Sequence, residues 1–279
     1  MLRSQTDIEK LEIHATDGPI GLVKDLYFDD DAWAIRYLVV DTGSWLMSRK
    51  VLISPIAFQQ PDWVNGTLPV SLTQEQVKHS PDFDSEKPVS RQNEELYMEY
   101  YGYPLYWGGA GMWGWGLYPY SMVPDTTGYP LEAEKKGMPH SRAERTAQRN
   151  HDDPHLRSCH ELTGYHLLAT NGELGHIAGY LIDDETWAIR YLIVDTSNWW
   201  MGHKVLIAPE WITAMLWSDE TVSVELTREA VQDSPVYDPA VAWSREFEER
   251  LYQHYGRPGY WVHGDKDGAA GDVATKDET

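Results

Sequence analysis

Hydrophobic and polar positions alternate over short stretches along much of this chain, and a period of two is typical of β-strands. β-branched and aromatic residues fill residues 33–41 and the similar run 187–195, so both runs predict strands. Two shorter runs, Lys50–Ile53 and Lys204–Ile207, predict strands that follow them. Residues 67–72 and 221–226 also alternate. The pattern therefore predicts a mainly β chain.

Turn and helix signals separate these strands. The acidic runs 29–31 and 183–185 stand between apolar runs and predict turns, as do the Asp-Gly and Asn-Gly pairs at Gly18 and Gly172. Residues that favour helix ends predict one short and one longer helix after the strands. These residues occur in pairs, Thr73 and Thr227, Ser90 and Ser244, and Gly102 and Gly256.

The chain contains the same pattern twice. Residues 18–55 align with residues 172–209 without a gap, and 20 of the 38 aligned positions are identical. The offset is 154, and it also pairs Tyr106-Trp107 with Tyr260-Trp261. Solenoid repeats are only about 20–50 residues long, so this offset indicates a tandem domain duplication. Short strands, tight turns and a trailing helix predict one small β-barrel in each repeat.

The connection between the repeats has two parts of different composition. Residues 103–124 are rich in Gly, Trp, Tyr and Pro and are not expected to form a stable helix. Residues 125–157 are charged and predict a linker, with a helical stretch around residues 141–149.

Composition narrows the class of protein. The 279 residues include 13 Trp and 17 Tyr, too many for a chain that is disordered throughout. Cys159 is the single cysteine, which excludes an intrachain disulfide and a Cys-rich zinc module. No run approaches the roughly 20 apolar residues of a membrane-spanning helix, and the N-terminus is polar. We therefore expect a cytoplasmic protein with no membrane span.

Net charge argues against one class of partner. Lys and Arg number 23 and Asp and Glu number 44, which gives a net charge of −21. Nucleic-acid binding normally needs a basic face that displaces counterions from phosphates. We therefore do not expect nucleic acid as a partner of this chain.

Candidate catalytic and metal-binding residues are few. His151, His155, His160 and His166 lie near Cys159, but their spacing matches no closed zinc pattern, so solvated histidines are expected. The acidic runs lack the alternation of a calcium loop. Residues 108–111 are not followed by the Lys and helix of a phosphate loop. We expect no metal, no cofactor, no catalytic residues and no enzymatic activity.

Three charged residues recur in both copies beside or within apolar strands: Arg36 and Arg190, Asp41 and Asp195, and Lys50 and Lys204. Such charges can serve catalysis. They can also pair across neighbouring strands and fix the register, at about 0.2–1 kcal/mol for each pair. We favour structural charge pairs, and Asp41 and Lys50 bracket one hairpin and could face each other.

Apolar residues also recur in the connection between the two main strands. Trp45, Leu46 and Met47 correspond to Trp199, Trp200 and Met201. Apolar loop residues either cover the edge of a core or meet a partner, and Trp is enriched at interface hot spots. Two interpretations stay open, packing within the chain and contact with a partner. We expect a pseudo-two-fold packing of the repeats that a second copy of the chain could also use.

These motifs resemble the PRC-barrel domain family. The similar residues are the aspartates before 33–41, the run WAIRYLVVD with its following TGSWL, the KVLISP strand, and the later LTQEQVKHSP. The family takes its name from the cytoplasmic domain of the photosynthetic reaction-centre H subunit. The resemblance implies a small six-stranded barrel that acts in docking or assembly, without shared catalytic residues. We expect a first domain at 5–107, a connecting segment at 108–159, a second domain at 160–262 and a disordered acidic tail at 263–279.

Three classes of function follow from the sequence. The leading hypothesis is a non-enzymatic protein–protein interaction or assembly module whose protein partner the sequence does not name. The alternative is an accessory protein of photosynthetic electron transport, similar to the H subunit but without its membrane anchor. A small enzyme or a metal carrier is the third class.

Overall fold

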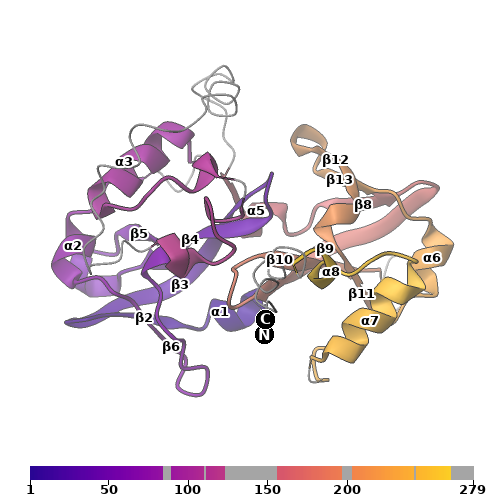
Figure 1. Cartoon of the computed structure of the whole chain (residues 1–279), viewed down its shortest axis with the longest axis horizontal. Helices are drawn as coiled ribbons and strands as arrows, with labels where there is room; N and C mark the ends of the chain where they lie inside the picture. Colours follow the sequence, from indigo (N-terminus) through magenta and orange to yellow (C-terminus); the bar gives the residue numbers. More distant parts are fainter. Residues whose placement is uncertain (84–88, 110, 123–155, 197–202, 242, 265–279) are drawn as a thin grey trace, which may run out of the picture. The chain divides into compact units, whose positions relative to one another are not determined.

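A computed structural model describes residues 1–83, 89–109, 111–122, 156–196, 203–241 and 243–264 (Figure 1). The chain is mainly β, with two sheets and a few short helices, as the sequence predicts. The predicted linker helix around 141–149 and most of the predicted acidic tail lie outside the described residues. No helix in the described ranges has both the length and the apolar character needed to cross a bilayer.

The first repeat forms six strands and three α-helices in the described ranges. They are β1 (Leu2–Ser4), α1 (Gln5–Ile8), β2 (Glu12–Ala15), β3 (Gly18–Asp29), β4 (Ala34–Asp41), β5 (Lys50–Ile53), β6 (Thr67–Pro69), α2 (Gln74–Lys78) and α3 (Arg91–Tyr101). Short 3-10 turns are also present as η1 (Gly43–Leu46), η2 (Pro55–Ala57), η3 (Tyr106–Gly108) and η4 (Pro119–Met122).

The second repeat has the same order of elements, with one additional strand. They are β7 (Leu156–Ser158), α5 (Cys159–Leu162), β8 (His166–Ala169), β9 (Gly172–Asp183), β10 (Ile189–Asp195), β11 (Lys204–Ile207), β12 (Ile212–Leu216), β13 (Thr221–Val224), α6 (Arg228–Gln232), α7 (Arg245–His254) and α8 (Trp261–Gly264). The 3-10 turns are η6 (Pro209–Trp211) and η7 (Trp217–Asp219).

Strand pairing follows chain order at the centre of each sheet. One sheet has the order β5-β4-β3-β2-β6, with β7 paired to β3. The other has the order β11-β10-β9-β8-β13-β12, with β1 paired to β9. In each sheet the connection between the outer strands brings two strands parallel, β2 with β6 and β8 with β13. The pairings between described strands form open paths, and closure into barrels stays a prediction.

The predicted strands β5 and β11 have the predicted bounds, whereas β4 and β10 begin later than expected. Trp33 and Trp187 have φ angles of 51° and 60°, in the left-handed region that strands do not use. The Trp33 amide donates to the Asp29 carbonyl at 2.7 Å and closes the turn. The strand β4 can therefore start only at Ala34.

The predicted helix ends are confirmed. Thr73 forms a capping box with Gln76 at the start of α2, and Val77 on this helix is fully buried, as its inward position predicts. Ser90 caps α3, and Gly102 follows that helix in the left-handed conformation that glycine allows.

The chain divides into two compact units whose boundary does not follow the repeats. The first unit comprises Met1–Tyr165, Ile177–Leu192 and Ala208–Glu210, and the second comprises His166–His176, Ile193–Ile207 and Trp211–Thr279. The first unit therefore includes the end of β9 and the start of β10, and it holds all of β1, β3, β4 and β7. Apolar side chains of β3 and β4 form much of its core.

Candidate interaction surface

Two strands of the first unit are exchanged between the repeats. The strand β1, from the first repeat, pairs antiparallel with β9, and β7, from the second repeat, pairs antiparallel with β3. The partners are Leu2 with Asp183 and Leu156 with Asp29, two pairs that differ by 154 at both members. Each repeat thus supplies a strand that completes the other, through the same residues.

Ion pairs accompany both exchanged strands. Arg3 Nε lies 3.1 Å from Asp184 Oδ2, and Arg157 Nε lies 3.4 Å from Asp30 Oδ2. These pairs also correspond at the offset of 154. Burial raises the pKa of Asp30, and the nearby Arg157 opposes this effect. The aspartate runs, which the sequence assigns to turns, therefore also anchor arginines of the exchanged strands.

A short bridge lies between the two exchanged pairs. Ala34 and Ala188 form an isolated antiparallel bridge. The Ile35 amide donates to the Trp187 carbonyl at 2.8 Å, and the Ile189 amide donates to the Trp33 carbonyl at 2.7 Å. Every residue of this bridge has its counterpart, 154 positions away, on the opposite side of the bridge.

A buried arginine organises the interior next to this region. The Arg36 side chain is 2% exposed, and its Nη2 lies 3.2 Å from Asp29 Oδ2. Its Nη1 donates to the Met112 carbonyl at 2.8 Å. The guanidinium lies 3.8 Å from the centre of the Tyr106 ring and 4.6 Å from that of Trp113. A buried charge needs such partners, since an unpaired one costs several kcal/mol, of order 3–5 when a partner is removed.

The aromatic, glycine-rich segment is the cover of this arginine. Trp113 is 0% exposed, and its Nε1 donates to the Thr186 carbonyl at 2.9 Å. The glycines permit tight backbone contacts, since a Cβ on Gly109 would lie 2.0 Å from the Gly114 carbonyl oxygen. A Cβ on Gly111 would lie 2.4 Å from the Gly116 carbonyl oxygen. Part of this predicted association segment therefore packs within the chain.

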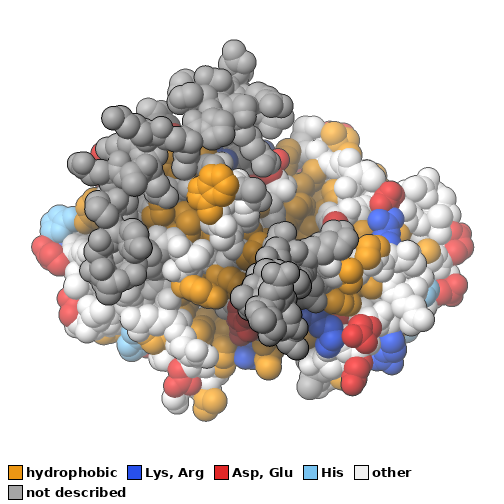
Figure 2. Space-filling view, viewed as in Figure 1, with side chains coloured by type: hydrophobic (Ala, Val, Ile, Leu, Met, Phe, Trp, Pro, Cys, Tyr) orange, Lys and Arg blue, Asp and Glu red, His pale blue; other side chains and the backbone are white. Residues whose placement is uncertain are grey.

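Other side chains of the same segment face outward. Trp115 is 70% exposed, and Leu105, Leu117 and Tyr120 are exposed as well. Hydrophobic side chains reach the molecular surface in the space-filling view (Figure 2). The segment thus has one side held inside the first unit and another side open to solvent.

The loop after β4 carries the predicted interface residues of the first repeat. Met47 is 92% exposed, Trp45 is exposed to a smaller extent, and Leu46 is half-buried. The Trp45 Nε1 donates to the Ile20 carbonyl at 2.5 Å, which fixes the indole against β3. Leu22, two residues further along β3, is also exposed. The equivalent residues Trp199, Trp200 and Met201 lie outside the described residues.

The predicted charge pairs have other partners in part. Arg36 and Arg190 pair across neighbouring strands, but with Asp29 and Asp183 from the acidic runs, at 3.2 and 3.1 Å. Asp41 and Lys50 face each other in the register of β4 and β5, as expected for the hairpin. Asp195 ends β10 and Lys204 begins β11 in the second repeat. None of these charged residues lies in a described pocket.

Burial and the Arg190 charge act in opposite directions on Asp183. Burial alone would raise the pKa of this carboxyl, but Arg190, the Glu185 amide and the Thr186 hydroxyl all stabilise the charged form. The result is a pKa below the usual value. The carboxylate is therefore ionised wherever the protein is folded near neutral pH.

The histidines near Cys159 take separate partners. His160 Nε2 lies 2.9 Å from Glu9 Oε1, and His166 Nδ1 lies 2.8 Å from Glu173 Oε1. Burial raises the pKa of the Cys159 thiol far above its usual value. His151 and His155 lie outside the described residues. Across the described ranges, no three His, Cys, Asp or Glu side chains are grouped in a way that could hold a metal ion.

The exchanged strands and the arginines they carry were not predicted from the sequence. The signal was present, since the triplet Leu-Arg-Ser occurs at 2–4 and again at 156–158, 154 residues apart. Both triplets lie before the aligned region 18–55 and its copy. Extending the alignment toward the N-terminus would have identified them.

The fold and the exposed apolar loop define a mainly β domain with a surface suited to contacts, and comparison with known proteins agrees. Residues 2–67, which span β1 to β6, match the family model of the PRC-barrel domain. This part of the chain belongs to the PRC-barrel domain family.

The chain is also similar to an uncharacterized protein of Deinococcus radiodurans. The two are 33% identical over 73 residues, which cover 26% of this chain and 26% of that protein. The match thus spans about a quarter of the length of the relative.

Proposed function

We propose that the chain is a non-enzymatic protein–protein interaction or assembly module built from two PRC-barrel repeats. The observation that carries the proposal is the loop after β4, where Met47 is almost completely exposed beside Trp45. Methionine and tryptophan are both enriched at interfaces, and the flexible thioether of methionine adapts to different partner surfaces. An apolar surface of this kind suits a protein partner.

The geometry of the loop supports a prepared contact surface. Met47 and Ser48 have φ angles of 52° and 56°, in the left-handed region, and this conformation turns the chain sharply after η1. The hydrogen bond from Trp45 to Ile20 holds the indole in one orientation. A partner would therefore meet a tryptophan whose orientation is already set, which reduces the entropy cost of binding.

Equivalent roles of the two repeats are part of the same proposal. The exchanged strands, their arginine–aspartate pairs and the Ala34–Ala188 bridge all relate by the offset of 154. A pseudo-two-fold relation of the repeats would place equivalent residues opposite each other in this way. We propose that the duplication provides two copies of one contact loop within a single chain in the cytoplasm.

A photo-crosslinking experiment tests the contact loop. The photoreactive residue p-benzoylphenylalanine replaces Met47 in cells of the source organism, and in a matched control it replaces Val64, which is 94% exposed on another loop. The proposal expects a crosslinked product of one defined mass from position 47 and not from position 64. Equal products from both positions, or none from position 47, would contradict it. Sedimentation of the purified chain then distinguishes a second copy from another protein.

The alternative function, an accessory role in photosynthetic electron transport, rests on the family resemblance. It expects the chain to purify together with pigment-containing complexes. Absorption spectra of the fractions that contain the chain measure this directly, and pigment-free fractions would exclude that role.

A further inference from the structure

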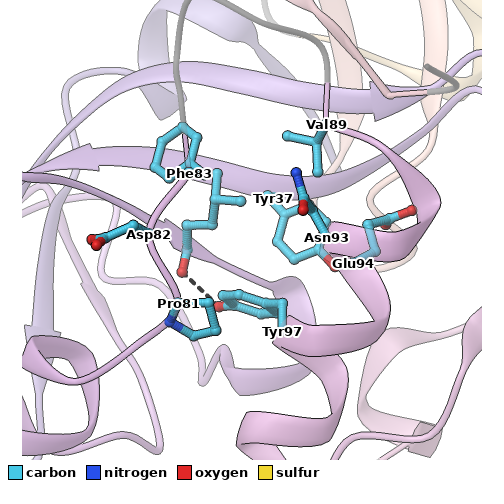
Figure 3. A pocket seen from close by; sticks show the side chains of 9 residues that line it. Tyr37, Pro81, Asp82, Phe83, Val89, Asn93, Glu94 and Tyr97 are labelled. Carbon is cyan, nitrogen blue, oxygen red and sulfur yellow. Dashed lines mark hydrogen bonds between the residues drawn. The ribbon is translucent and has the colours of Figure 1, made fainter. Parts of the chain in front are cut away.

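Both repeats have a cavity between the first turns of their longer helix and the loop that precedes it. In the first repeat this cavity is about 10 Å³, which is room for about one water molecule. Figure 3 shows the loop residues Pro81, Asp82 and Phe83 on one side and Val89 and Asn93, toward helix α3, on the other. The first repeat therefore has no room for a ligand at this place.

In the second repeat the corresponding place is open. A cavity of about 240 Å³ lies between the loop that carries Tyr237 and the start of α7. Four of its lining residues occupy the positions of four residues that line the small cavity, at the offset of 154. They are Val236, Tyr237, Trp243 and Phe247, in place of Asp82, Phe83, Val89 and Asn93.

The amino acids at equivalent positions explain why one cavity is closed. Tyr97 fills the first, and its hydroxyl donates to the Leu52 carbonyl at 2.5 Å (Figure 3). The second repeat has the smaller Leu251 at that position. The polar Asn93 is replaced by Phe247, so the open cavity also has a more apolar and aromatic lining.

The open cavity combines aromatic walls with a positive charge at its edge. The rings of Trp243 and Phe247 lie 5.5 Å apart and are tilted by 53°. The Arg250 guanidinium lies 5.8 Å from the centre of the Phe247 ring, and the side chain is exposed. Within the described ranges no carboxylate forms an ion pair with Arg250. Its hydrogen-bond donors are therefore available to a ligand.

One acidic residue also lines the cavity. The Asp238 Oδ1 accepts a hydrogen bond from the Ala240 amide at 2.8 Å, so this carboxylate takes part in the turn before the helix. Among the described residues, the lining thus offers one guanidinium without an ion pair and one carboxylate with a backbone partner. The charge balance at the cavity edge favours a negatively charged group on the ligand.

We propose that this cavity of the second repeat binds a small aromatic carboxylate. Its ring packs between Trp243 and Phe247, and its carboxylate accepts hydrogen bonds from Arg250. The volume lies below the range of about 300–1,000 Å³ that is usual for drug-sized ligands, which fits a molecule with a single ring system. The first repeat keeps the same fold with the cavity closed, so ligand binding distinguishes the two repeats.

Binding is measured on the full chain by isothermal titration calorimetry with two matched probes, 3-phenylpropionate and its neutral amide. The proposal expects the carboxylate to bind at least about tenfold more tightly, since a charge-assisted hydrogen bond is lost in the amide. Binding of neither probe, or equal binding of both, would overturn it.

Variants locate the site. Arg250→Gln is expected to weaken binding of the carboxylate about tenfold and to leave the amide unchanged, whereas Phe247→Asn, the residue of the first repeat, abolishes binding of the carboxylate. The control Leu96→Gln changes the position of the first repeat that corresponds to Arg250 and is exposed. Thermal unfolding verifies that each variant is folded. Carboxylate binding that survives both Arg250→Gln and Phe247→Asn would place the ligand elsewhere and refute the proposal.

Discussion

Replacing Trp113 with alanine tests whether the aromatic, glycine-rich segment is part of the folded core. The indole is fully buried, stacks near the Arg36 guanidinium and donates to the Thr186 carbonyl. Truncation of a buried Trp costs about 3–5 kcal/mol, because apolar contacts are lost and a cavity remains. The lost hydrogen bond and cation–π contact fall within this range because such terms are not additive. We therefore expect Trp113→Ala to lower the free energy of unfolding by about 3–5 kcal/mol.

Urea denaturation followed by circular dichroism measures this change, and the neighbouring Trp115 provides the control. Trp115 belongs to the same segment but is largely exposed, so Trp115→Ala should stay within about 0.5 kcal/mol of the wild type. Trp113→Phe keeps a ring but loses the donor, and it should cost less than the alanine variant, about 1–2 kcal/mol. Equal stabilities of Trp113→Ala and Trp115→Ala would refute the assignment of this segment to the core.

Four further outcomes follow from the structure. Arg36→Gln should destabilise the chain by about 3–5 kcal/mol, because Asp29 would keep a buried charge without its partner, while the more exposed Arg190→Gln should cost less in the same urea assay. Because the pKa of Asp183 is lowered in the folded state, its contribution to stability is present above its unfolded pKa and is lost as pH falls through the folded pKa; Asp183→Asn should therefore cost more near pH 7 than near pH 3, and an equal cost at both would contradict this. Burial raises the pKa of the Cys159 thiol, so iodoacetamide should leave it unmodified in the native protein near pH 8 and alkylate it after denaturation, as mass spectrometry detects. Met47→Ser should change stability by less than about 0.5 kcal/mol and reduce partner binding, and unchanged binding would remove this residue from the interface.

Local patterns predicted the elements of this fold well. The strands β5 and β11, the helix caps at Thr73 and Ser90, and the end of α3 at Gly102 are each determined by residues close in sequence. The exchange of β1 and β7 was missed because a pairing over about 180 residues leaves no periodic pattern within either strand. Only the repeated Leu-Arg-Ser triplet carried that information.

The candidate surface was predicted in part for a similar reason. The composition of residues 103–124 indicates an irregular segment, but it does not tell which tryptophan is inside. Trp113 is buried and Trp115 is exposed although the two are separated by a single glycine. The close approach of Gly109 to Gly114 sets this difference, and such contacts exist only in three dimensions.

The exchanged strands have a consequence for synthesis on the ribosome. The strand β1 emerges first, but its partner residues Leu181–Asp183 are made almost at the end of the second repeat's long hairpin strand. At about 5–20 residues per second, translation from residue 2 to residue 183 takes roughly 10–35 seconds. During this interval β3 also lacks β7 along Tyr27–Asp29. The nascent first repeat therefore displays an open strand edge, a natural site for chaperones, until the second repeat arrives to cover it.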